Sequence, residues 1–178
     1  MSLSPFFYLE KWNNKKNCYE EINIYKKAGE WASEEDKARG VEEIIFWPWN
    51  ATHDVFSLLG TDSRSYVYDP IAGVHYGEPP MVSETIKKKI DDFFNEESYY
   101  SATSTVRWIT LADLYIENLT HPKVIDYDTE WEDPDHKVYK DNPIKDVINR
   151  INTFVELGDD DWSIADNKSL IRLVYWVV

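Results

Sequence analysis

The last residues of the chain, Leu170–Val178, constrain the fold most, because they form a run that is apolar except for Arg172. A short run of aliphatic and aromatic side chains predicts a central strand that other elements cover on both faces. No apolar run in the sequence approaches the length of a membrane-spanning helix. The chain must therefore supply strands beside this run and helices above and below it.

The segment 143–157 carries the clearest helical pattern. Asn142 is a suitable N-cap, and Pro143 fits the first helical position, where a backbone N–H is not needed. Gly158 is placed to end the helix. Apolar side chains recur at helical spacing, namely Ile144, Val147, Ile148, Ile151, Phe154 and Val155. We expect Ile148, Ile151 and Phe154 to be buried against a sheet that includes Leu173 and Tyr175.

The N-terminal residues predict a β-hairpin and a third extended segment. Residues 5–12 are apolar and aromatic, residues 13–17 form a polar turn, and residues 19–25 alternate as a strand does. Residues 41–47 contain β-branched and aromatic side chains and predict a third strand, which Pro48 ends. Between them, the polar segment 29–40 is expected to hold one short helix capped by Ser33.

Capping residues indicate three further helices. Thr52 is suited to cap a short helix that ends before Gly60. Ser83 is suited to cap the next helix, whose apolar face comprises Ile86, Ile90, Phe93 and Phe94. Thr110 and Asp113 resemble a capping box. The helix that they open runs through Leu111, Leu114 and Tyr115.

Strands near both ends with helices between them indicate an α+β fold. We predict a mostly antiparallel sheet, formed by the N-terminal hairpin and the C-terminal strand, with several helices packed on it. The chain shows no internal repeat and no linker, so residues 1–178 are expected to form one domain. Within it, we expect a long loop over residues 61–80 and an acidic connector over about residues 118–141.

The net charge of −14 is unevenly distributed. Residues 1–40 carry seven basic and seven acidic side chains, so the whole excess lies in residues 41–178. Such a surface repels nucleic acid and anionic membranes, and we expect the protein to bind neither directly. The N-terminus lacks the basic and apolar regions of a signal peptide, which favours a cytoplasmic location.

The densest acidic stretch is residues 126–135, with six acids and no base. Three interpretations stay open: a solvated acidic loop, a cation-binding loop, or an acidic docking surface. An EF-hand would need a glycine at its sharp turn and a glutamate at its last position, and this stretch has neither. As a docking surface, it would use Glu130, Trp131 and Glu132, with the indole as an apolar anchor.

Tryptophans elsewhere divide into two groups. Trp47, Trp108 and Trp176 lie among apolar residues and are predicted to be core, whereas Trp12 and Trp31 lie in polar surroundings and are candidates for a partner surface.

Catalytic motifs are scarce. The four histidines, including His53 and His136, have no spacing that suits a shared metal, and Cys18 is alone, so we expect no metal and no cofactor. The sequence has no G-x-S-x-G elbow and no phosphate-binding glycine loop. On the 61–80 loop, Arg64, Asp69, His75 and Tyr76 could form an acid–base site for an anionic substrate. The alternative is that these four side chains hold the loop in place.

Several short blocks, taken in order, resemble a family of uncharacterised bacterial and bacteriophage proteins. They lie at residues 52–59, 76–83, 107–114 and 171–177. The family carries motifs like R-x-Y-x-L-F-x-x-L, R-G-L-P-x-D-V-S and S-W-L-T-L-x-E-L, and ends in a strand like V-R-I-V-F-W-F. This chain has Tyr76 in place of an arginine, His53 in place of an aromatic residue and Asp113 in place of a glutamate. The resemblance implies a prophage setting and no reaction.

Three functional hypotheses follow. The first is a phage-related protein that binds a protein partner through its acidic surface. The second is a small hydrolase or transferase with a site on the 61–80 loop. The third is a nucleic-acid mimic, whose carboxylates would imitate phosphates and block a DNA-binding protein.

Overall fold

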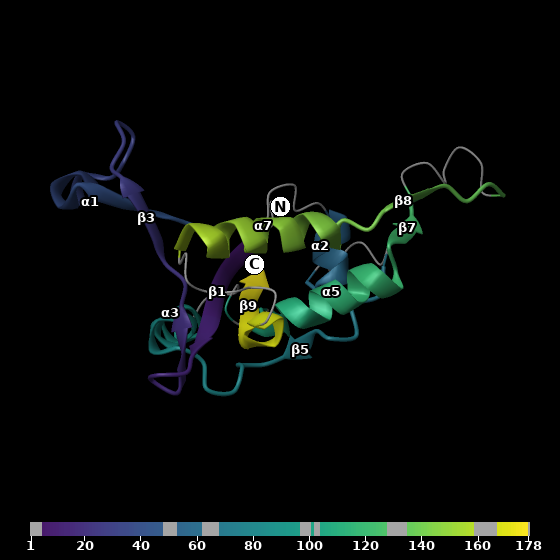
Figure 1. The fold of residues 1–178 in the computed structure, drawn as a ribbon, viewed down its shortest axis with the longest axis horizontal. Coiled ribbons are helices and arrows are strands. Elements are labelled where there is room, and N and C mark those ends of the chain that lie inside the picture. The colour runs from purple at the N-terminus through teal and green to yellow at the C-terminus, as the bar shows by residue number, and fades with distance from the viewer. Residues whose placement is uncertain are drawn as a thin grey trace.

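The computed structural model describes residues 5–47, 53–61, 68–96, 101, 104–127, 135–158 and 167–177. Its centre is an antiparallel sheet with the strand order β2-β1-β9-β6-β5. Figure 1 labels three of these strands, β1, β9 and β5. The strands are β1 (Pro5–Asn13), β2 (Cys18–Glu21), β5 (His75–Tyr76), β6 (Arg107–Thr110) and β9 (Ile171–Val177). The predicted α+β fold, with an N-terminal hairpin beside the C-terminal strand, is confirmed.

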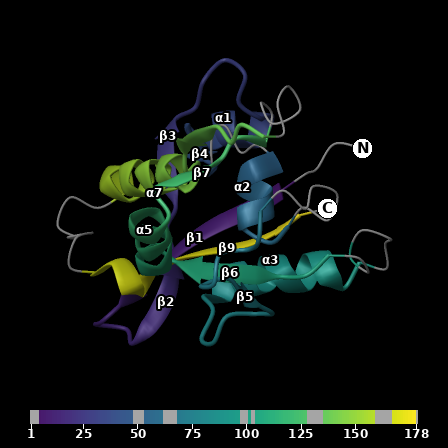
Figure 2. The ribbon, with the colours of Figure 1, turned by 90° about the vertical axis from the view of Figure 1, so that its right-hand side faces the viewer.

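The C-terminal strand β9 is central, as its composition predicts. It pairs with β1 on one side and β6 on the other, and all its side chains are buried. One face, with Leu173 and Tyr175, packs on α2 (His53–Leu58), α5 (Leu111–Thr120) and α7 (Ile144–Gly158). The other face, with Val174 and Trp176, packs on α3 (Glu84–Phe94). Figure 2 shows the sheet between these two helical layers, which explains why both faces of β9 are apolar except at Arg172.

Helix α7 lies where the sequence predicts it. Ile144 N–H donates to the side-chain oxygen of Asn142 over 3.0 Å, as expected of a cap. Ile148, Ile151 and Phe154 are buried in the same cluster as Leu173 and Tyr175. The predicted packing of this helix on the sheet is therefore confirmed.

Other predicted caps are present, with one difference. Ser33 caps α1 (Glu34–Arg39) and Thr110 caps α5 by accepting from the backbone N–H three residues later. Gly60 follows α2 with a φ of 70°, a left-handed conformation that suits glycine. Ser83 precedes α3, but its side chain makes no capping hydrogen bond. Thr52 lies outside the described residues.

Two short hairpins extend from the three layers. The arm comprises β3 (Ile24–Lys27), α1 and β4 (Val41–Ile44), and none of the α1 side chains is buried. The second hairpin comprises β7 (Lys123–Ile125) and β8 (Tyr139–Asp141). We call it the acidic hairpin, because the acidic residues 126–135 lie between its two strands in the sequence. Figure 1 shows the arm and the acidic hairpin at opposite ends of the molecule.

Four predictions about local structure need correction. Residues 19–25 are not one strand, because the chain leaves β1 after Ile22 and begins the arm. The 61–80 loop contains strand β5, and the 118–141 connector contains the end of α5 and the β7 and β8 strands. Trp47 is 43% exposed and so is not core.

No helix among the described residues is long and apolar enough to cross a membrane.

Candidate functional site

Three of the four predicted acid–base residues of the 61–80 loop are described: Asp69, His75 and Tyr76. His75 and Tyr76 form strand β5, and consecutive strand residues point to opposite faces of a sheet. The His75 ring stacks on Trp108 with 4.1 Å between centroids. Tyr76 lies on the other face, where its hydroxyl approaches Gly60 and the Arg107 guanidinium is 5.2 Å from its ring.

Asp69 lies away from strand β5 in the sequence and lines a hollow in the surface. This hollow, of about 360 Å³, is lined by Asp69 together with Glu117, His121 and Lys123 near the end of α5. No hydrogen bond or ion pair between described residues joins Asp69 to His75 or Tyr76, and Arg64 lies outside the described residues. Within the described part of the chain, no group of three or more histidine, cysteine or acidic side chains is arranged to hold a metal. Among the described candidates, Asp69 thus lines one hollow, and His75 and Tyr76 lie on opposite faces of the sheet.

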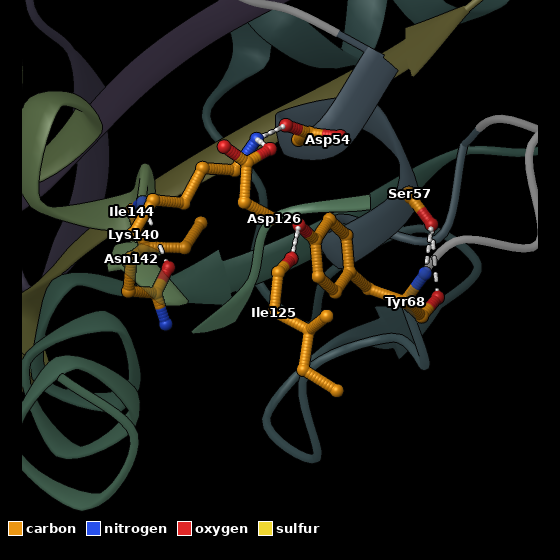
Figure 3. A network of polar contacts seen from close by, with 8 residues as sticks. All are labelled: Asp54, Ser57, Tyr68, Ile125, Asp126, Lys140, Asn142 and Ile144. Carbon is orange, nitrogen blue, oxygen red and sulfur yellow. Dashed lines mark hydrogen bonds and ion pairs between the residues drawn. The ribbon is translucent and has the colours of Figure 1, made fainter. Parts of the chain in front are cut away.

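The acidic hairpin has a firmly held base (Figure 3). Lys140 on β8 donates to Asp54 on α2 over 2.6 Å and lies 3.3 Å from an Asp126 carboxylate oxygen. Burial acts to lower the pKa of Lys140, but the hydrogen bond and charge of Asp54 outweigh it and raise that pKa. One lysine thus connects the two strands of the acidic hairpin to helix α2.

Tyr68 adds a second connection at the same place. Its hydroxyl donates to the carbonyl oxygen of Ile125 at the end of β7. Its backbone N–H donates to Ser57 on α2 over 3.1 Å, and Ser57 donates back to the Tyr68 carbonyl over 2.8 Å. Burial, followed by the negative charge of Asp54, raises the pKa of Tyr68 to about 12. The hydroxyl therefore keeps its proton, and its role as a donor, through the physiological pH range.

Asn142 fixes the far side of the acidic hairpin. It is buried, accepts from Ile144 at the start of α7 and donates from its amide to the His121 carbonyl over 2.9 Å. Its own N–H donates to the Pro122 carbonyl over 3.0 Å. The two strands are thus held between α5 and α7 at one end. The predicted partner residues Glu130, Trp131 and Glu132 follow β7 in the sequence and lie outside the described residues.

A second candidate site is an apolar cavity of about 520 Å³ beside strand β1. Phe6–Leu9, the chain after β4 and Phe154 of α7 line it. Three charged side chains, Glu21, Glu43 and Lys89, lie among these apolar residues. Mostly apolar walls with a few charged groups are typical of a binding cavity of this size. Sequence reasoning missed this cavity, because its lining comes from five segments that are far apart in the sequence.

A buried ion pair lies on the α3 face of the sheet. Arg172 donates through Nε to Glu10, and both side chains are almost fully buried. Glu10 also accepts from the Ser83 N–H over 3.0 Å, and the Arg172 guanidinium is 3.6 Å from the Tyr19 ring centroid. The one sequence signal for this pair was a charged residue within an apolar run. Its contacts hold β1, β9 and α3 together, which is a structural role.

No protein-family model, curated protein or solved structure matches this chain. The resemblance to bacteriophage proteins therefore stays a prediction, and any functional conclusion rests on the geometry described above.

Proposed function

We propose that this protein acts by binding a basic protein partner through its acidic hairpin. The observation that carries the proposal is the position of this hairpin: it extends from the body, and Lys140 and Tyr68 fix its base to α2 (Figures 1 and 3). A rigid base lowers the conformational entropy that an interacting segment loses on binding.

The charge of the segment indicates the kind of partner. Residues 126–135 contain six acids and no base, within a chain of net charge −14. Exposed charges of one sign speed the encounter with a surface of the opposite sign, and a tryptophan among them supplies apolar contact area. Glu130, Trp131 and Glu132 are the residues that we expect to contact the partner. If the chain has the prophage setting that the resemblance implies, the partner is a host protein.

Affinity capture from a host lysate tests this proposal. The bait is the wild-type protein beside a variant carrying Glu130→Gln, Trp131→Ala and Glu132→Gln. We expect a basic protein to be enriched at low salt and to be lost in the variant. Raising the salt should weaken the capture, because exposed charges are screened beyond about 8 Å at physiological ionic strength. The captured protein is then purified and its binding measured by calorimetry.

The arm offers a matched control. The variant Trp31→Ala, Glu34→Gln and Glu35→Gln changes the same kinds of residue at the opposite end of the molecule, where Trp31 is 94% exposed. It should bind the partner as tightly as wild type. Loss of binding in the arm variant, or equal binding by the hairpin variant, would show that the acidic hairpin is not the contact surface.

A further inference from the structure

Strand β1 has an open edge along the first part of its length. Its partner β2 pairs only with Glu10–Asn13, and the last hydrogen bond runs from the Ile22 N–H to the Leu9 carbonyl over 2.8 Å. The chain then turns away into the arm and pairs with β4 instead. On its other edge, β1 pairs with β9 from Pro5 to Lys11.

The direction of the Leu9 carbonyl shows which backbone groups face this open edge. Backbone groups of successive strand residues point to alternate edges, so Phe7 points the same way as Leu9, away from β9. No backbone hydrogen bond joins Phe7 to a described residue on this side. Its N–H and C=O therefore present one donor and one acceptor to an added strand.

The apolar cavity of about 520 Å³ lies along this same edge, because four successive β1 residues, Phe6–Leu9, line it. Four strand residues extend over about 13 Å. Phe154 of α7 and the residues that follow β4 also line the cavity. The free backbone groups of Phe7 thus lie beside the apolar side chains of the cavity. This arrangement suits an extended peptide better than a helix or a flat ring compound.

The charges at the cavity favour a basic residue in that peptide. Lys89 is already paired with Glu21 and lies 4.4 Å from the Tyr8 ring centroid. Glu43 is exposed at the rim and forms no ion pair with a described residue. Burial raises the pKa of Tyr8, and the negative charges of Glu21 and Glu43 raise it further.

We propose that the open edge of β1 binds an extended peptide, which adds a strand beside Phe7, inserts apolar side chains into the cavity and places a lysine or arginine against Glu43. This site is separate from the acidic hairpin, so it can fail while the proposed function holds.

Selection from a display library of short linear random peptides tests the proposal. On the wild-type protein, we expect enriched peptides with apolar residues at alternate positions, at least one lysine or arginine, and no proline between them. The variant Glu43→Lys should bind them about tenfold more weakly, because a rim attraction becomes a repulsion. The matched control Glu35→Lys makes the same charge reversal on α1, away from the cavity, and should bind as wild type does.

Amide hydrogen exchange gives a measurement that does not depend on a substitution. In the free protein, the Phe7 amide should exchange faster than the Tyr8 amide, which points toward β9. Adding the most enriched peptide should slow exchange at Phe7. The proposal is overturned if no peptide is enriched, if both charge reversals bind equally, or if Phe7 is unaffected by the peptide. It is also overturned if Phe7 becomes protected in a concentration-dependent dimer, since a second copy would then occupy the edge.

Discussion

Arg172 and Glu10 show how two residues can hold three elements in place. Their ion pair connects β1 to β9, and Glu10 also accepts from the N–H that precedes α3. Removing one charge from a buried pair leaves the other without compensation, which costs about 3–5 kcal/mol. Replacing both with apolar groups removes that penalty. The pair therefore fixes the relative positions of β1, β9 and α3 and adds little net stability.

We expect Glu10→Gln and Arg172→Met each to lower the free energy of unfolding by about 3–5 kcal/mol, measured by urea denaturation. The double variant Glu10→Gln, Arg172→Met should recover most of this loss, because no charge is then left buried. Additive losses in the double variant would contradict the assignment, since they would show that the two charges do not compensate each other.

At the scale of elements, the sequence predicts helices better than strand pairing. Helix α7 follows from local signals, namely Asn142, Pro143 and the spacing of its apolar residues. Strand β5 and the β7–β8 pair have no such signal, because they are two or three residues long and depend on distant partners. The cavity beside β1 was missed for the same reason. The cavity lies where β2 no longer pairs with β1. The amino-acid composition does not show where that pairing ends.

Helix α7 should stabilise the fold through its buried face. Ile151 is 1% exposed, and Ile151→Ala should lower the free energy of unfolding by about 2–5 kcal/mol. Leu157, which is 65% exposed on the same helix, provides the control: Leu157→Ala should change stability by less than about 0.5 kcal/mol. Both are measured by urea denaturation, and equal losses would show that the helix does not pack as described.

In the molecule as a whole, the sheet and the helices on its two faces form a body from which the arm and the acidic hairpin extend. The acidic hairpin joins this body through Tyr68 and Lys140 (Figure 3). The fixed base of the acidic hairpin therefore depends in part on polar contacts. Such contacts respond to pH, which makes their contribution measurable.

Stability should fall as the pH rises above 10, and Tyr68 should account for part of the fall. Folding raises the pKa of this phenol from 10.0 to about 12. Between these values the unfolded chain loses the proton while the folded chain keeps it, so the folded state binds more protons and loses stability with rising pH. Burial also raises the pKa values of Tyr8 and Tyr175. Tyr68→Phe should therefore flatten, but not abolish, the decline in the urea midpoint between pH 10 and pH 12. An unchanged slope would show that the Tyr68 hydroxyl is not buried beside Asp54 as described.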